Sequence, residues 1–145
     1  MLRIRAALAL AQVGDNGGVP AMSQALDQCD DVLLCRLMIL NLGRLRDPRA
    51  VPALLAHLPE VQNRREMVDA LGDIGDPAAR DALLARLRGD EYVPVRVQAA
   101  RALAKLGDTA VIPALEQAAA QETEATVVAA AREAIASLKA RAPSR

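Results

Sequence analysis

A short pattern that recurs four times places the strongest constraint on the fold of this chain. Each copy has a leucine, an aliphatic residue three positions later and an aspartate two positions after that. The four aspartates are Asp15, Asp47, Asp76 and Asp108, so successive copies are 32, 29 and 32 residues apart. A period near 30 residues that holds two helical stretches is typical of stacked helical hairpins, in which each hairpin contacts only its neighbours.

Other positions keep the same register. A proline follows three of the aspartates by five residues, and Asp81 takes that place in the third copy. Two residues further on, every copy has a large apolar residue, which we expect to face the core between helices: Met22, Leu54, Leu83 and Leu115.

The repeated aspartates have the chemistry of helix N-caps. A carboxylate at this position accepts a hydrogen bond from a free backbone N–H, and its charge complements the helix dipole. Pro48 and Pro77 directly follow two of the aspartates, at the first helical position where proline is best tolerated. We therefore predict that a helix begins after each of Asp15, Asp47, Asp76 and Asp108.

The residue before each aspartate bears on how the preceding helix ends. Gly14, Gly75 and Gly107 can adopt the left-handed conformation that commonly ends a helix. Arg46 stands at this place in the second copy, and we expect the turn there to differ.

These signals predict an all-α fold of nine helices, a right-handed α-solenoid of about four and a half hairpins. The first helices of the hairpins are expected at 18–28, 48–58, 77–88 and 109–120. The second helices are expected at 2–13, 32–45, 61–74, 94–106 and 125–140. Residues 1–141 then form a single array that starts in a second helix, and residues 142–145 form a frayed tail.

Composition agrees with thin stacked layers and narrows the function. The chain has one Tyr and no Trp or Phe, and close-packed helix layers can be filled by Ala, Leu, Val and Ile alone. The 18 basic residues are balanced by 18 acidic ones, which argues against a general polyanion binder. No apolar run approaches 18 residues, so no membrane-spanning helix is expected.

Residues 95–115 resemble a known repeat. Val95-Arg96, Ala99-Ala100, Leu103 to Asp108 and Pro113-Ala-Leu115 are similar to the HEAT repeat of the type found in phycobilin lyase subunits, and 42–58 and 71–87 follow the same pattern. The resemblance implies that second helices line a concave face and first helices a convex face. It also implies that Arg3, Arg64 and Arg96 form a ladder with the turn aspartates. Cys35 and Val128 interrupt that ladder.

Candidates for chemistry are few. His57 is the single histidine and stands near a helix end, so neither a metal site nor a catalytic triad is predicted. Cys29 and Cys35 are expected to be small packing residues, with a redox pair as the alternative. We predict a non-enzymatic, cytoplasmic protein without a metal or a cofactor.

The predicted concave face offers the best candidate site. Leu8 and Leu40 occupy the register of Asp69, Arg101 and Glu133 in other repeats, and Leu37 occupies that of Glu66 and Gln98. An apolar patch on a protein surface commonly marks an interface. The residues predicted to bind a partner protein are Leu8, Arg36, Leu37, Leu40, Arg65, Asp69 and Arg101.

Three alternatives stay open. The apolar face can instead cover a missing neighbour, with self-association through the open N-terminal end. The resemblance also allows an accessory or catalytic subunit of a bilin-lyase-like enzyme. A nucleic-acid binder is disfavoured, because Glu66 and Asp69 interleave with the arginines and no aromatic side chain is there to stack a base.

Overall fold

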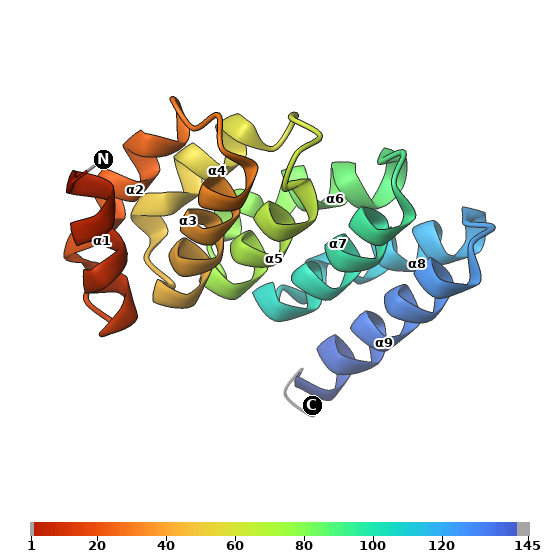
Figure 1. Ribbon diagram of the computed structural model, residues 1–145. Helices are drawn as coiled ribbons and strands as arrows, with labels where there is room; N and C mark the ends of the chain where they lie inside the picture. Colours follow the sequence, from red (N-terminus) through yellow and green to blue (C-terminus); the bar gives the residue numbers. More distant parts are fainter. Residues whose placement is uncertain (1, 142–145) are drawn as a thin grey trace.

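A computed structural model describes residues 2–141, and within them the chain is helical without any β-strand. The second helices form one row, and the first helices form a layer behind it (Figure 1). The row consists of α1 (Leu2–Gln12), α3 (Val32–Leu45), α5 (Arg64–Ile74), α7 (Val93–Leu106) and α9 (Ala125–Arg141). The layer consists of α2 (Val19–Leu26), α4 (Val51–His57), α6 (Arg80–Gly89) and α8 (Ile112–Gln121). The prediction of an all-α solenoid with nine helices is confirmed for this part of the chain.

Each first helix is preceded by a separate turn of 3₁₀-helix. These turns span Asn16–Gly18, Pro48–Ala50, Pro77–Ala79 and Thr109–Val111. The aspartate before each turn has an extended backbone, and its Oδ1 accepts the N–H of the residue two positions later at 2.7–2.9 Å. The caps therefore act on the 3₁₀ turn, one turn before the α-helix that the repeat pattern predicts.

The glycine before the aspartate ends the preceding helix in a left-handed conformation. Gly14, Gly75 and Gly107 have φ values of 77°, 75° and 74°. Arg46 has φ 52° and donates its N–H to Gly43 in the same way. The expectation that this turn differs was wrong, because helix geometry imposes the left-handed residue even where a side chain makes it less favourable.

Among the second helices, α5 differs most from its predicted bounds, because the connection before it is longer than expected. The prediction started this helix at residue 61, whereas it begins at Arg64. Asn63 precedes it with φ 58°, and its side-chain amide donates to the carbonyl oxygen of Val32 in the neighbouring hairpin at 3.1 Å. This contact with α3 fixes the turn in place of a side-chain cap.

The core runs along the whole stack between the two layers. Met22, Leu54, Leu83 and Leu115 are completely buried, at the positions where the repeat predicts them. Small residues bring neighbouring second helices close together. A Cβ atom at Gly43 would lie 2.8 Å from Cα of Ala70, and one at Gly72 would lie 2.8 Å from Cα of Ala102. The row α3–α5–α7 thus depends on glycine at its contact points.

Within residues 2–141, no helix combines the length and the apolar character needed to cross a lipid bilayer. The tail predicted at residues 142–145 lies outside the described residues.

Candidate partner-binding face

The exposed side of α3, α5 and α7 brings together most of the predicted site residues. A depression of about 120 Å³ is lined by Arg36, Leu40, Arg65, Glu66, Asp69 and Gln98. Leu37 and Leu40 expose 47% and 45% of their surface, which is unusual for residues in the middle of a core-packed helix. We call this surface, with Arg101, the second-helix face.

Ion pairs hold part of this face together. Arg36 on α3 pairs with Glu66 on α5 at 3.1 Å. Asp69 accepts hydrogen bonds from Gln98 at 2.6 Å and from Lys105 at 2.7 Å, both on α7. Asp69 is therefore already satisfied within the chain and serves first to tie α5 to α7.

Lys105 is the centre of this charged cluster. Its ammonium contacts the carboxylates of Asp69 and Asp73, each at 2.7 Å. Burial lowers the pKa of Lys105, but the hydrogen bonds to the two carboxylates outweigh burial and leave the pKa raised. Lys105 thus braces α7 against two carboxylates of α5.

Two arginines on the face have free guanidinium groups. Arg65 and Arg101 are exposed and form no ion pair with any carboxylate in residues 2–141. They line a second depression of about 410 Å³ between α5, α7 and α9, with apolar walls from Val97, Pro94 and Ala129 and one acid, Glu133. Arg65 and Gln98 border both depressions, so the two lie side by side, and we refer to them together as the groove.

Leu8 does not belong with the other predicted residues. It is half-buried on α1, packs against the core and lines neither depression. Leu33, which we did not select, is 74% exposed on the first turn of α3. It precedes Leu37 by four residues and so lies on the same side of the helix, a spacing that the sequence alone reveals.

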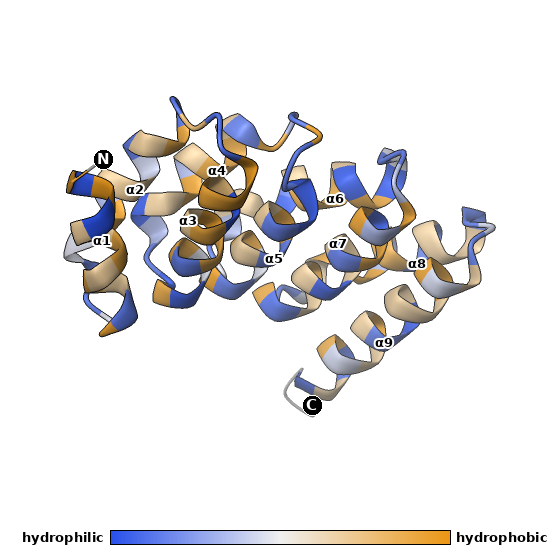
Figure 2. Ribbon diagram, in the orientation of Figure 1, coloured by the Kyte–Doolittle hydropathy of each residue, from blue (hydrophilic) through white to orange (hydrophobic). Residues whose placement is uncertain are grey.

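Hydropathy varies along the row in a way that separates the two halves. Figure 2 shows α3 coloured largely as hydrophobic, whereas α5 carries many hydrophilic residues. The apolar part of the second-helix face therefore lies on α3, and the charged part lies on α5 and α7.

Family comparisons agree with this repeat architecture. The model of HEAT repeats matches residues 56–136, which is more than half of the chain, and the model of the PBS lyase HEAT-like repeat matches residues 2–28 and 38–58. The chain belongs to the HEAT-repeat family. HEAT repeats generally mediate protein–protein interaction. A search of curated proteins finds no match to this chain.

The arginine ladder of this HEAT array differs from the expectation. Arg64 pairs with the buried carboxylate of Asp90 at 3.2 Å, and Arg96 pairs with Glu122 at 2.8 Å. The predicted partners were the turn aspartates, which follow the second helices. Asp108 follows the end of α7, twelve residues after Arg96, and this separation is about 18 Å along a helix axis, so the two side chains cannot meet.

The ladder instead joins the second helix of one HEAT hairpin to the loop of the next hairpin, α5 to Asp90 and α7 to Glu122. Glu122 also accepts the backbone N–H groups of Thr123 and Glu124 ahead of α9. The hydrogen bond from the Glu124 N–H, together with Arg96, holds the pKa of Glu122 below its usual value despite burial. Arg3, the third predicted member, is exposed on α1 and forms no ion pair within the described residues.

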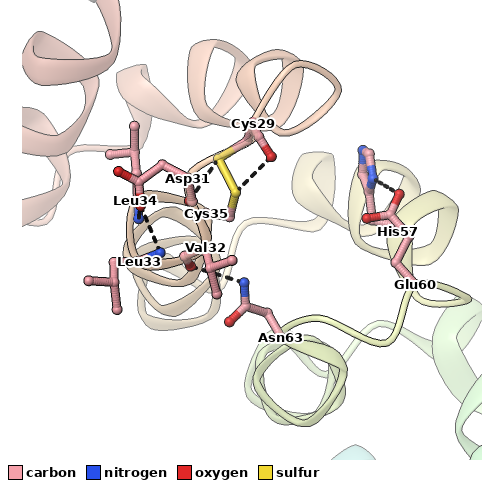
Figure 3. The surroundings of a disulfide bond; sticks show 9 residues. All are labelled: Cys29, Asp31, Val32, Leu33, Leu34, Cys35, His57, Glu60 and Asn63. Atoms are coloured by element: carbon pink, nitrogen blue, oxygen red, sulfur yellow. Dashed lines mark hydrogen bonds and ion pairs between the residues drawn. A yellow bond between two sulfur atoms is a disulfide. The ribbon is translucent and has the colours of Figure 1, made fainter.

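The two cysteines are joined in a disulfide bond, with their Cα atoms 5.8 Å apart. The bond links the loop after α2 to the first turn of α3 (Figure 3). The expectation that Cys29 and Cys35 are small packing residues was wrong, and of the alternative, a redox pair, the structure has the bond between the two cysteines. The first turn of α3 brings Cys35 back over the loop, which six residues of separation allow but do not require.

His57 lies half-buried at the end of α4, as expected. Its ring contacts Glu60 at 2.9 Å and Asp27, at the end of the preceding first helix, at 3.0 Å. The hydrogen bond to Glu60, and then that to Asp27, raise the pKa of His57 against the effect of burial. Within residues 2–141, no three His, Cys, Asp or Glu side chains are grouped so as to hold a metal ion.

Proposed function

We propose that this HEAT-repeat chain is a non-catalytic interaction module that binds a partner protein on the second-helix face. The observation that carries the proposal is the exposure of Leu37 and Leu40 at positions where the sister helix α5 has Glu66 and Asp69. Exposed aliphatic side chains beside unpaired arginines are common at protein interfaces.

The groove also suggests the chemistry of the partner. Its α3 end offers leucines, and its other end offers the free guanidinium groups of Arg65 on α5 and Arg101 on α7. A partner segment that presents aliphatic side chains to α3 and a carboxylate to the arginines would complement both ends.

The test is the double change Leu37→Glu, Leu40→Glu. Folding should survive, because α5 carries acids in the same register. Partner binding should fall by at least about 100-fold, since unpaired carboxylates buried at an interface cost several kcal/mol. Pulldown from the source cell would identify the partner, and calorimetry with the purified partner would give the affinity.

A matched control is Val13→Glu, Val61→Glu, which adds the same two charges at exposed apolar positions outside the face. This control should keep wild-type affinity, and circular dichroism should show both variants equally helical. Wild-type affinity of the Leu37/Leu40 variant for the same partner would rule out the second-helix face as the interface.

A second candidate function follows from the match to the PBS lyase HEAT-like repeat. As a bilin-lyase-like subunit, the chain would hold a tetrapyrrole in the groove together with a partner subunit. Incubation with a bilin would then shift its absorbance spectrum, and Arg65→Glu, Arg101→Glu would weaken the shift by removing cations from the groove. An unchanged spectrum argues for the interaction module.

Self-association and cellular location are further parts of the proposal. Leu2 is 83% exposed on α1, so association of two copies through this end should be lost in Leu2→Glu, as measured by sedimentation velocity. The cytoplasm remains our proposed location. Disulfides that form in the cytoplasm of mesophiles are usually transient or redox-sensing, which bears on the cysteine pair.

A further inference from the structure

Two hairpins of the array share a clasp made by an arginine. The Arg64 guanidinium donates to the carbonyl oxygen of Leu58 at 3.1 Å, and the Arg96 guanidinium donates to that of Asp90 at 2.7 Å. In each case the carbonyl lies six residues before the arginine, in the loop that precedes the second helix. The clasp therefore holds this loop against the first turn of α5 or α7.

Cys35 stands at the same register position on α3, 29 residues before Arg64. Its Sγ lies 3.0 Å from the carbonyl oxygen of Cys29, again six residues earlier, and is bonded to Cys29 Sγ. A sulfur in a disulfide has no proton to donate, so the S–S bond itself closes the loop. In the α2–α3 hairpin a covalent bond does what an arginine does in the next two.

Between its two ends, where His57 contacts Asp27 and Asn63 donates to Val32, the remaining bonds of this loop are local. Cys29 donates its N–H to Leu26, and Asp31 caps the N–H groups of Leu33 and Leu34. Asp31 itself is exposed, so these bonds compete with water. Without the disulfide, no long side chain would hold the loop to α3.

The disulfide is also accessible. Both cysteines are only partly buried. A cleft of about 270 Å³ opens beside Cys29 and is lined on its other sides by Ile4, Gln28, Leu34 and Met38. A small thiol, or the tip of a redox protein, can therefore approach the Cys29 sulfur without unfolding the hairpin.

We propose that Cys29–Cys35 is a reversible thiol–disulfide site that accepts electrons from a dithiol and thereby unclasps the first hairpin. A thiolate of the reductant attacks Cys29 Sγ, and Cys35 leaves as a thiolate that takes up a proton. The second thiol of the reductant, as its thiolate, then attacks the mixed disulfide and releases Cys29, which is protonated in turn. Two electrons and two protons reach the protein, and the dithiol becomes a disulfide.

Leu33 lies on the first turn of α3, one turn before Leu37, so the redox state would set the order of the apolar end of the second-helix face. This consequence rests on the proposed function, whereas the site itself does not. The tests below need no partner and so separate the two.

The first test asks whether the folded protein undergoes the reaction. Dithiothreitol should release two thiols, counted with Ellman's reagent, while circular dichroism shows the helices intact. Removal of the reductant and addition of oxidised glutathione should restore the disulfide. If thiols appear only after urea unfolds the chain, the bond is a fixed structural link and the proposal is wrong.

The second test asks what reduction does, by hydrogen exchange of the full chain. Amides of residues 27–36 should exchange about tenfold faster in the reduced protein. The corresponding segment at 88–97, held by Arg96, provides the internal control and should not change. Equal exchange of residues 27–36 in both redox states would overturn the unclasping.

A third test uses a variant that carries the arginine clasp of the next two hairpins. In the variant Cys29→Ala, Cys35→Arg, the amides of residues 27–36 should exchange as slowly as in the oxidised protein, with or without reductant. The reason is that arginine can donate hydrogen bonds to the loop carbonyls as Arg64 does. Cys29→Ser, Cys35→Ser should match the reduced protein. If the arginine variant exchanges as fast as the serine variant, the disulfide and the arginine are not equivalent clasps, and the assignment fails.

Discussion

The hairpins α2–α3 and α6–α7 have the same backbone plan, but different chemistry holds them in place. In α2–α3, a disulfide closes the loop and the outer side of α3 presents Leu33 and Leu37 to solvent. In α6–α7, the loop is closed by Arg96, and the outer side of α7 is joined to α5 through Gln98 and Lys105.

This contrast shows how one repeat can serve two purposes. The polar groups around α7 are largely satisfied within the chain, so that part of the array is a self-sufficient stack. The apolar side of α3 has no such complement in residues 2–141, and exposed apolar area is the surface that gains most from a partner. Because the repeats share one register, a few side-chain changes on the outer side of a second helix convert a self-paired polar surface into an exposed apolar one.

The largest expected effect tests whether the two halves share one core. Leu83→Ala and Met22→Ala should each lower the free energy of unfolding by roughly 2–5 kcal/mol, because both side chains are completely buried at equivalent positions. Urea denaturation would measure the change. A cost at Met22 far below that at Leu83 would show that the disulfide-linked hairpin is loosely packed, which would sharpen the contrast.

The arginine clasp should matter more than the covalent one. Arg64→Ala should cost about 3 kcal/mol, because it leaves the buried Asp90 carboxylate with fewer partners. Reduction of the disulfide should lower the free energy of unfolding by about 2 kcal/mol, because the bond closes a loop of only a few residues. Arg65→Ala, next to Arg64 but exposed and unpaired, serves as the control and should cost less than about 0.5 kcal/mol. If reduction of the disulfide lowered the stability more than Arg64→Ala does, the covalent clasp would be the stronger one and the comparison would fail.

A smaller effect concerns the helix ends. Arg46→Gly should stabilise the chain by about 0.5 kcal/mol, because glycine adopts φ 52° without strain but loses more backbone entropy on folding. Gly75→Ala, at the same position of the next repeat, should destabilise it by about 1 kcal/mol. Thermal melts of the pair would show opposite shifts. Shifts of the same sign would mean that the two turns are not equivalent.

The smallest effect is the pH dependence of the link between the first two hairpins. The pKa of His57 is raised by Glu60 and Asp27, so the contribution of the charged imidazole is fully present below its unfolded pKa, about 6.5. The contribution is lost as the pH rises through the folded value. As the pH rises, the free energy of unfolding of the wild type should therefore fall relative to that of His57→Gln. Urea melts of both proteins from about pH 5.5 to 8.5, roughly the range in which histidine titrates, would measure the difference. Parallel curves would show that His57 does not link the hairpins.

Much of the fold could be predicted because its signals are local. An aspartate cap reaches an N–H two residues away, and a left-handed residue acts within one turn of helix. Comparison with sister repeats predicted that Leu37 and Leu40 are exposed, and the structure places Leu40 in one depression with Arg36 and Arg65. The candidate face was thus partly visible in the repeat register.

The sequence by itself therefore determined the hairpins, their caps, the buried apolar positions and the apolar character of α3. Only the tertiary structure decided that Arg64 meets Asp90, that Lys105 braces Asp69, and that Leu8 turns toward the core. It also decided that Cys35 returns to Cys29. The physical reason is that these contacts depend on how far each helix is rotated and offset against the next one. A repeat pattern specifies which side of a helix is apolar, but it does not specify which long polar side chain of the neighbouring hairpin will lie within reach.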